Sequence, residues 1–512
     1  MTKLKFRFHN SIILITIFFQ FSCSSPKEKR EVVLFNSYCT SCHIAPSIQD
    51  LPKEIWATNI LPEMGARMGV RDSTYNPFKG FTFSEINIIN QTGVYPLDPI
   101  ISAADWKLLQ EYIISMAPVS LEKDNSKNTY NELVQFTPKP ISFDSINGSF
   151  ITLLKLDHDH KLICGNISGE LWEFDFSNQK ISPIGQFGKA IVDYTELDGI
   201  TYVTSIGDLH PSEFSSGQIF TLENNITTRI PEVLHRPVHS LVHDLDNNGT
   251  NEIIVSEFGN LTGKLSLIRK VDSVNFKKEI LLNQPGTIRV IAKDMNNDGK
   301  EDLIALTSQG NESITILYQQ ENLKFSAQQV LRFSPVYGSS WFDLIDYNGD
   351  GFDDIITVNG DNADKSYVQK GYHGMRVHLN DGSNNFEEKY FYPLHGATRV
   401  VSNDFDQDGD IDFGLISTFP DYENEPESSF VYLENKNPDT FSFSAYTFDA
   451  SKLGRWFLMN SEDIDDDGDI DIILSSFTYA FTPVPELLYE LWNESNLDLM
   501  ILENKLITKD KL

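Results

Sequence analysis

An acidic loop of fixed pattern occurs five times in the second half of the chain. Each copy carries an oxygen-bearing side chain at positions 1, 3, 5 and 9 and a glycine at position 6, as in residues 404–412, DFDQDGDID. The glycine allows a sharp backbone turn, and Ca²⁺ prefers alternating carboxylate and amide oxygens of this kind. The loops therefore predict up to five calcium sites. Their candidate ligands are Asp244, Asp246, Asn248, Glu252, Asp294, Asn296, Asp298, Asp302, Asp346, Asn348, Asp350, Asp354, Asp404, Asp406, Asp408, Asp412, Asp463, Asp465, Asp467 and Asp471.

The residues around each loop exclude the helical calcium-binding fold of EF-hand proteins. An EF-hand loop needs a glutamate at position 12 and a helix on either side. Position 12 holds no carboxylate in any copy; its occupants are Val255, Ala305, Thr357, Leu415 and Leu474. Short β-branched and apolar runs flank each loop and predict strands. The repeated unit is therefore a strand, a loop and a second strand.

The spacing of the loops predicts the architecture. Their first aspartates are 50, 52, 58 and 59 residues apart. Such an interval accommodates a four-stranded sheet, which is one blade of a β-propeller. Two weaker copies, in residues 156–165 and 192–203, keep the strand pattern without the complete ligand set. Five complete and two degenerate copies predict an all-β propeller of seven blades.

The loops and their flanking strands resemble FG-GAP or VCBS repeats, the blades of integrin-α-like seven-bladed propellers, over residues 140–512. The resemblance implies calcium binding by the side chains at positions 1, 3, 5 and 9 and by the backbone carbonyl at position 7. It also implies that bound calcium stiffens the propeller. The alternative is that the acidic turns only join strands, since turns favour aspartate, asparagine and glycine.

The N-terminus has the composition of a bacterial export signal. Basic residues precede an apolar run from Ile12 to Phe21, which is too short to span a membrane. The run ends at Ser22 and Cys23, which resembles a lipoprotein signal with residues 1–22 removed, Cys23 lipidated and residues 23–30 as a tether. An ordinary signal peptide is the alternative. Both predict an extracytoplasmic protein, and the lipoprotein signal predicts a lipid anchor in a bacterial membrane, at the periplasmic or the cell surface.

The cysteine spacing predicts a covalently bound haem. Cys39, Cys42 and His43 form a C-x-x-C-H motif, the attachment sequence of one c-type haem. Two thiols at this spacing add across the haem vinyl groups, and the adjoining imidazole becomes the proximal iron ligand. A redox-active pair or half of a zinc site is the alternative, although the chain has no second C-x-x-C motif.

Residues 31–118 resemble a mono-haem cytochrome c domain, a small all-α fold. Trp106, Leu109 and Ile113 have helical spacing and are expected to pack on one face of its last helix. The resemblance implies Met64 as the distal iron ligand, with Met68 as the reserve candidate. The polar residues 119–139 are expected to link this domain to the propeller.

Length and charge fit this organisation. The chain has 512 residues, of which 73 are acidic and 41 basic, and its net charge is −32. The length suits a small haem domain followed by a propeller. The negative charge argues against nucleic-acid binding because phosphates would be repelled. Seventeen of the candidate calcium ligands are carboxylates, so metal binding accounts for much of the acidity.

Side chains five positions before each loop form a further candidate site. They are His239, Arg289, Trp341, Arg399 and Leu458. If the strand before each loop is the innermost of its blade, these side chains converge on the central channel. The histidine, the two arginines and the tryptophan would suit an anionic ligand or a carbohydrate. Contacts between blades are the alternative interpretation.

These features favour an extracytoplasmic electron carrier. One haem c would exchange electrons with a redox partner protein or a small-molecule electron donor, and the propeller would bind a partner or ligand. A first alternative is that the propeller is a sugar or alcohol dehydrogenase that reduces the fused haem. A second is a cell-surface adhesion or scaffold protein. No nucleophile motif, phosphate-binding loop or catalytic triad is recognisable, so the sequence leaves enzymatic activity open.

Overall fold

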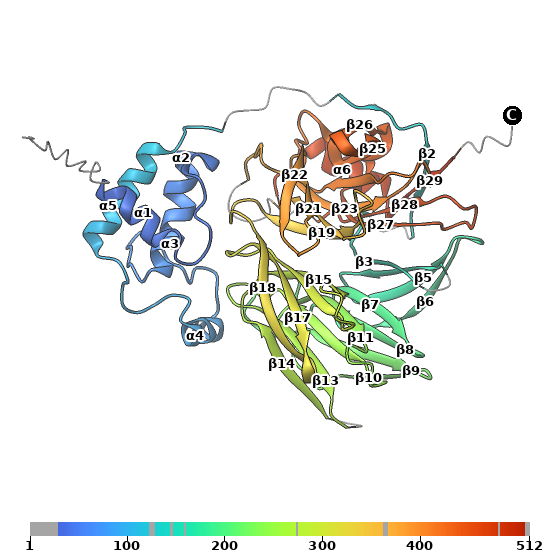
Figure 1. Ribbon diagram of the computed structural model, residues 1–512, viewed down its shortest axis with the longest axis horizontal. Helices are drawn as coiled ribbons and strands as arrows, with labels where there is room; N and C mark the ends of the chain where they lie inside the picture. Colours follow the sequence, from blue (N-terminus) through green and yellow to red (C-terminus); the bar gives the residue numbers. More distant parts are fainter. Residues whose placement is uncertain are drawn as a thin grey trace, which may run out of the picture.

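The computed structural model describes residues 29–121, 129–143, 147–157, 160–272, 275–361, 367–479 and 482–506. The expected signal at 1–22, Cys23 and most of the expected tether lie outside these residues. Seven sheets surround a common axis, and a group of helices lies beside them (Figure 1). Among the described residues, no helix has the length and apolar character needed to cross a membrane.

The seven sheets are the blades of a propeller. The first strand of each blade contacts the first strand of the next, and β27 contacts β3, so the ring is closed. The prediction of seven blades is confirmed, and the strand before each loop is the innermost of its blade. The innermost strands are β3 (Ile151–Leu156), β7 (Ile191–Leu197), β11 (Pro237–His243), β15 (Thr287–Lys293), β19 (Ser339–Ile345), β23 (Ala397–Asn403) and β27 (Trp456–Glu462).

The second strands form the core between blades. They are β4 (Leu162–Asn166), β8 (Ile200–Ser205), β12 (Glu252–Glu257), β16 (Asp302–Thr307), β20 (Asp354–Asn359), β24 (Asp412–Ser417) and β28 (Asp471–Ser476). In the five blades with complete loops, every residue of this strand is buried. In β12, for example, Ile253 packs with Ile219 of the preceding blade and Ile254 with Val290 of the next. Burial on both faces explains why these strands are continuous apolar runs.

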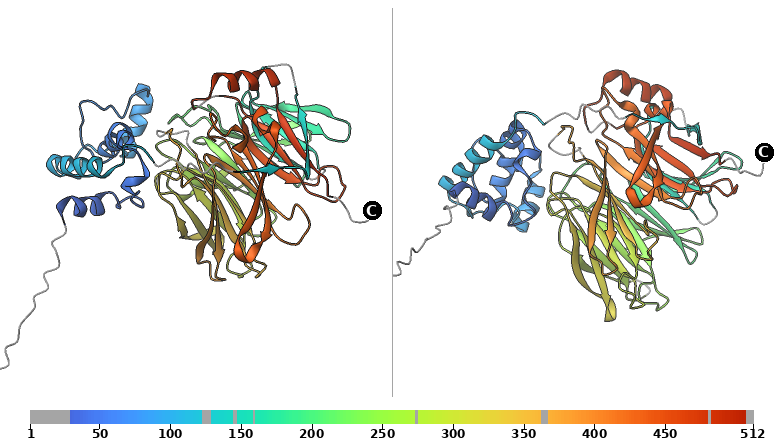
Figure 2. Two further views of the ribbon diagram at one scale, coloured as in Figure 1. Left: turned by 90° about the horizontal axis from the view of Figure 1, so that it is seen from above. Right: turned by 45° about the horizontal axis from the view of Figure 1, so that its top comes forward.

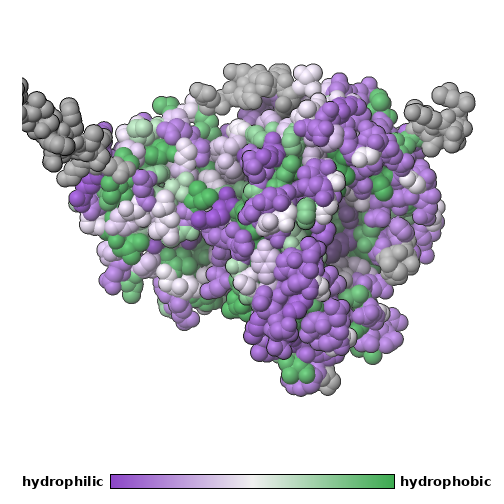
Figure 3. Space-filling model, viewed as in Figure 1, coloured by the Kyte–Doolittle hydropathy of each residue, from purple (hydrophilic) through white to green (hydrophobic). Residues whose placement is uncertain are grey.

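The outer strands complete each antiparallel blade and present mainly hydrophilic surface (Figure 3). They are β5 (Glu170–Asp175), β6 (Lys180–Gln186), β9 (Gln218–Glu223), β10 (Ile226–Arg229), β13 (Lys264–Lys270), β14 (Phe276–Leu282), β17 (Ser313–Gln320), β18 (Lys324–Arg332), β21 (Gly374–Asn380), β22 (Phe386–Pro393), β25 (Phe430–Asn437), β26 (Ser442–Thr447) and β29 (Leu499–Asn504). The connections carry α6 (Glu486–Ser495) and the short 3₁₀ turns η3 (Glu321–Leu323), η4 (Pro426–Ser429), η5 (Pro438–Thr440) and η6 (Asp449–Leu453).

The last blade is completed by a strand from the other end of the ring. β2 (Phe136–Ile141) pairs antiparallel with β29 as its outermost strand, and β1 (Asn131–Glu132) joins β26 in the preceding blade. The expected linker at 119–139 is therefore too long, because its last residues belong to the propeller. Pro138 and Pro140 give the segment the composition of a linker, but an outermost strand tolerates proline because one of its edges needs no N–H donors.

Residues 30–117 form a helical segment beside the propeller (Figure 2). Its helices are α1 (Arg30–Tyr38), η1 (Ile48–Asp50), α2 (Lys53–Ile55), the π-helical turn η2 (Trp56–Ile60), α3 (Leu61–Arg67), α4 (Phe83–Thr92) and α5 (Ala103–Met116). Trp106, Leu109 and Ile113 are the buried residues of α5 and face one apolar core, as their spacing predicts. Pro118 follows the helix end at Met116.

The helical segment contacts the propeller face opposite the acidic loops. Val336, between β18 and β19, packs into the core of the helical segment, and Leu261, between β12 and β13, packs against a second apolar cluster there. The hydroxyl of Tyr372, between β20 and β21, donates a 3.0 Å hydrogen bond to the carbonyl of Asp50. The acidic loops join first strands to second strands, so they lie at the other end of the blades.

Glu85 joins α4 to the propeller. Its carboxylate accepts hydrogen bonds from the amide and hydroxyl of Thr82 at 3.0 and 2.8 Å, from the hydroxyl of Ser212 at 2.8 Å and from the amide of Glu213 at 3.3 Å. Burial acts to raise the pKa of Glu85, but these hydrogen bonds outweigh it and hold the pKa below the ordinary value. The ionised carboxylate therefore stabilises the contact between the two parts of the chain.

Replacing Glu85 with alanine is expected to loosen α4, because it leaves donors at Thr82 and Ser212 unpaired at a cost of about 1–3 kcal/mol. Hydrogen exchange of the α4 amides should accelerate in this variant at neutral pH. In the wild type the ionised Glu85 contributes its full stabilisation to the fold above the ordinary pKa of glutamate. This contribution is lost as the pH falls through the lower pKa that Glu85 has in the folded state. Glu54→Ala, an exposed site on the same segment, is the control. Equal exchange rates in the two variants would contradict the assigned role.

Candidate functional site

The five acidic loops share one backbone conformation. In each loop the two oxygens of the first aspartate accept hydrogen bonds from the amides at positions 5 and 6, as Asp404 does from Asp408 at 3.1 Å and Gly409 at 3.0 Å. The residue at position 4 and the glycine at position 6 have positive φ in all five. A Cβ on these glycines would meet no atom within 4 Å, so glycine is needed for its backbone freedom and not for space.

The position 9 carboxylates are buried at the base of each loop. Asp471 accepts hydrogen bonds from the amide of Ile464 at 3.2 Å and from Asn504 of β29 at 2.7 Å. Burial, together with the neighbouring loop carboxylates, raises the pKa of Asp471, Asp412 and Glu252 to about 7 and that of Asp354 to about 6. Negative charge is thus unfavourable here without a compensating cation.

Three loops bring carboxylate oxygens at positions 1, 3 and 9 within 4.8 Å of one another. These groups are Asp244, Asp246 and Glu252; Asp404, Asp406 and Asp412; and Asp463, Asp465 and Asp471. In the other two loops position 3 is an asparagine, and the amides of Asn296 and Asn348 donate to Asp298 at 3.4 Å and Asp350 at 2.9 Å. Clustered, partly buried oxygens whose charge is uncompensated are a donor set that fits Ca²⁺.

The cysteine–histidine motif begins where α1 ends. Cys39 is the C-terminal cap of α1 and is half-buried, whereas Cys42 is exposed. Nδ1 of His43 lies 2.8 Å from the carbonyl oxygen of Ile44. Because a carbonyl only accepts, this contact assigns the proton to Nδ1 and leaves the lone pair of Nε2 for a metal. Burial raises the pKa of the Cys39 thiol to about 11, so the thiol is neutral.

Met64 and Met68 lie on the same apolar core as Cys39. Met64 is in α3 and Met68 caps it, and both are partly buried. The core also contains the ring of Trp106, and a Cβ on Gly65 would come within 3.0 Å of that ring, so the glycine allows α3 and α5 to approach closely. Two thiols, an imidazole with a free Nε2 and a thioether beside an apolar core are a donor set that fits haem c.

The residues predicted to line the channel occupy equivalent positions on the innermost strands. Each innermost strand has a register shift near its start, and the residue just after it is Leu153, Asp193, His239, Arg289, Trp341, Arg399 or Leu458. The innermost strands begin at the face that the helical segment contacts. These side chains therefore lie nearer to that face than to the acidic loops.

The two arginines converge on the tryptophan. The guanidinium carbons of Arg289 and Arg399 each lie 4.1 Å from the centre of the Trp341 ring. Arg289 also donates to the carbonyl of Phe342 at 2.6 Å and lies 3.7 Å from a carboxylate oxygen of Asp343. For Arg289 the structure thus provides contacts between neighbouring blades, which was the alternative interpretation.

His239 belongs to a second group, on the blades that precede Arg289 around the ring. Its Nε2 lies 3.9 Å from Asp193, whose other oxygen is 2.5 Å from the ammonium of Lys155. Burial lowers the pKa of His239 to about 4 although the charge of Asp193 acts to raise it, so the ring is neutral at pH 7.

Sequence reasoning missed the acidic partners Asp193 and Asp343. Asp343 follows Trp341 by two residues and so lies on the same side of β19, a signal that alternation alone provides. Asp193 belongs to a degenerate copy without an acidic loop. Its position therefore could not be found by counting back from a loop aspartate, as that of His239 was.

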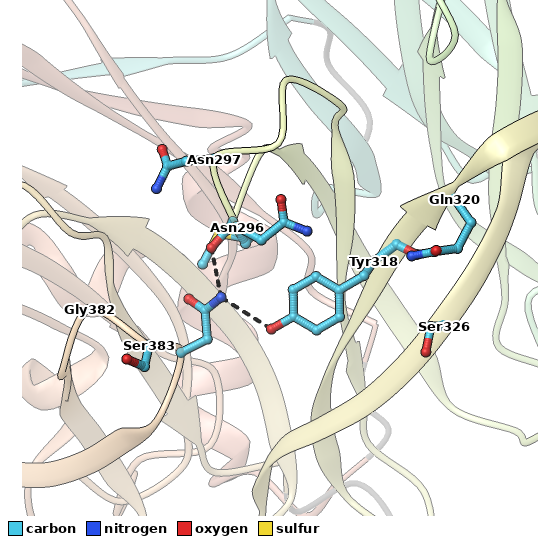
Figure 4. A pocket seen from close by; sticks show the side chains of 9 residues that line it. Asn296, Asn297, Tyr318, Gln320, Ser326, Gly382 and Ser383 are labelled. Atoms are coloured by element: carbon cyan, nitrogen blue, oxygen red, sulfur yellow. Dashed lines mark hydrogen bonds between the residues drawn. The ribbon is translucent and has the colours of Figure 1, made fainter.

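A surface pocket of about 470 Å³ adjoins the acidic loop of the fourth blade (Figure 4). Amide and hydroxyl side chains dominate its wall, and Asn384 donates to the carbonyl of Met295 at 2.7 Å and to the hydroxyl of Tyr318 at 3.1 Å. It is lined by Met295, Asn296, Asn297, Tyr318, Gln320, Ser326, Gly382, Ser383 and Asn384. Asn296 is also a candidate calcium ligand, so the pocket is an extension of that loop.

A model of the FG-GAP-like repeat matches residues 294–357, from the acidic loop of the fourth blade into the second strand of the fifth. The chain therefore contains an FG-GAP-like repeat within its seven-bladed propeller. No curated protein matches the chain.

Similar solved structures share little sequence with the chain. YCF48 bound to D1 peptide has 10% identity over 74% of this chain and 100% of its own, with a TM-score of 0.44. The Neurospora crassa Pan2 WD40 domain has 12% identity over 70% of this chain and 90% of its own, with a TM-score of 0.41. An auxiliary nutrient binding protein from Bacteroides ovatus has 12% identity over 56% of this chain and 74% of its own, with a TM-score of 0.35. Similarities this weak carry no conclusion about function.

Proposed function

We propose that this protein is an extracytoplasmic haem c electron carrier whose calcium-stabilised propeller binds a partner or ligand. The observation that carries the proposal is the C-x-x-C-H motif at the end of α1, with Nδ1 of His43 held by the carbonyl of Ile44. Such a hydrogen bond orients the imidazole and makes Nε2 a better ligand. When bound, haem c supplies one-electron transfer.

Residues of the helical segment have distinct roles in this proposal. Cys39 and Cys42 would attach the haem covalently, and His43 would be its proximal ligand. Met64 would be the distal ligand, with Met68 one helical turn further along the chain as the reserve candidate. The haem domain spans residues 31–118, and the linker to the propeller ends before β1. Exposed apolar side chains on this segment, such as Val33 and Ile44, provide a surface for a redox partner protein.

The acidic loops have a structural role in this proposal. Up to five Ca²⁺ ions compensate the buried position 9 carboxylates and fix the loops that join first to second strands. The loops lie on the face opposite the helical segment, which supports a stabilising role and argues against a direct part in electron transfer. Lipidation of Cys23 would keep the protein at a bacterial membrane.

Two experiments on the purified, exported protein test this function. A pyridine haemochrome spectrum should show about one haem c per chain. A panel of sugars and alcohols, added without any partner protein, should leave the haem oxidised, whereas a small-molecule reductant should reduce it. A protein without covalent haem would refute the electron carrier. Reduction by a sugar or alcohol alone would instead establish the dehydrogenase alternative, with the propeller as the catalytic part.

A further inference from the structure

Arg399 is a partly buried cation on the propeller axis that forms no salt bridge with a carboxylate among the described residues. Its Nη1 donates to the carbonyls of Ser340 and Thr398, both at 3.2 Å. The carboxylate of Asp361, an exposed residue just after β20, is near enough to raise the pKa of Arg399. A partly buried cation is more stable when an anion binds it directly.

The neighbouring charges are already paired. Arg289 shares its charge with Asp343, and Lys155 shares its charge with Asp193. Neither carboxylate reaches Arg399, whose pKa is lowered to about 9 by burial and by the positive charge of Arg289. Among these cations, Arg399 is therefore the one for which the described carboxylates provide only the more distant Asp361.

The shape of the site is suited to a planar anion. Trp341 holds both guanidinium groups by cation–π contact, with each guanidinium carbon 4.1 Å from the ring centre. Nη1 of Arg399 already donates hydrogen bonds to two carbonyls. The edge of the guanidinium formed by Nε and Nη2 is therefore the part that remains for a ligand. That edge presents two parallel N–H donors, the geometry that matches a carboxylate.

The axis is accessible to solvent at this level. The side chains of Arg289 and His239 keep 20% and 19% of their surface exposed although both are on innermost strands of a closed ring. Nδ1 of His239 is buried without a hydrogen-bond partner among the described residues. A polar group in this state is expected to meet a water or a ligand.

We propose that the propeller axis binds a small carboxylate-bearing molecule, held by the Nε and Nη2 edge of Arg399 and by the cationic pair on Trp341. Arg289 contributes attraction, while its pairing with Asp343 keeps it in place. The neutral imidazole of His239 offers a hydrogen bond to a polar group elsewhere on the ligand. The site faces the helical segment, so its ligand would lie on the side of the propeller where the haem is proposed.

Succinate and inorganic phosphate are the probes that test this site, each against chloride at matched ionic strength. Succinate should raise the melting temperature of the holo-protein by about 2–4 °C and change the tryptophan fluorescence. The Arg399→Lys variant keeps the positive charge but loses the two parallel N–H donors of the guanidinium. Its apparent Kd for succinate should therefore rise about tenfold or more. Trp341→Phe should remove the fluorescence change.

Arg229→Lys is the matched control, because Arg229 is exposed on the outermost strand of the second blade. It should bind succinate like the wild type. Equal binding by Arg399→Lys and the control, or no response of the wild type to succinate beyond that to chloride, would overturn the proposal. Preference for phosphate over succinate would overturn the carboxylate assignment. The test does not depend on haem, so its failure and that of the electron carrier are separate results.

Discussion

The Cys42→Ser variant is expected to lose most of its covalent haem, because one of the two thioether bonds no longer forms. The measurement is the haem absorbance that stays with the polypeptide after acid–acetone extraction and denaturation. Wild-type protein should retain about one haem per chain, and the variant should retain only a small fraction. The propeller should still fold, because Cys42 is exposed and contributes nothing to its core.

Cys164→Ala is the matched control for this experiment. Cys164 is buried in β4, far from the helical segment in the fold, and burial raises the pKa of its thiol. This variant should keep its haem and lose at most a little stability, because the side chain is small. Equal haem content in Cys42→Ser and Cys164→Ala would contradict the assignment of the motif.

Removal of calcium is expected to lower the melting temperature of the protein strongly. A ligand that binds only the folded state at 100 times its Kd adds about 2.7 kcal/mol per site, and the chain has up to five candidate sites. Each kcal/mol corresponds to roughly 2–4 °C for domains of 150–250 residues, and to less for a larger propeller. Thermal melts with excess calcium and after exhaustive chelation should therefore differ by several degrees or more.

A single loop variant assigns this effect to the acidic loops. Asp471→Asn removes one ligand charge in the last blade, and it should shrink the difference between the calcium and chelator melts. Asp175→Asn, at the end of β5 in the first blade and outside the acidic loops, should leave the difference unchanged. A wild-type melt that chelation does not move would count against all five metal sites.

The features that sequence analysis predicted correctly are encoded locally. Each acidic loop carries its own glycine, and the next strand carries an apolar run because both its faces are covered. The face of α5 was likewise readable from Trp106, Leu109 and Ile113, because helical spacing needs no knowledge of the partner. The size of a blade followed from the interval between repeats, and the number of blades from five complete and two degenerate copies.

The features that were missed depend on contacts between distant parts of the chain. Nothing within residues 136–141 indicates a partner strand at the C-terminal end, and the polar residues before them argued for a linker. The pairing of Arg289 with Asp343, and of His239 with Asp193, arises because blades meet at the axis. Glu85 looks like an ordinary capping residue until Ser212 and Glu213 are brought beside it by the fold.

The strand that completes the last blade also sets the order in which the protein matures. Phe136 pairs with Asn504, so nearly the whole propeller must be present before β2 finds its partner. Contacts between such distant residues form late and slowly. The motif at 39–43 precedes both paired strands in the sequence, so in the proposed electron carrier haem attachment could take place while the ring is still open. A chain that stops before Leu499 would keep that motif and yet leave the propeller unclosed.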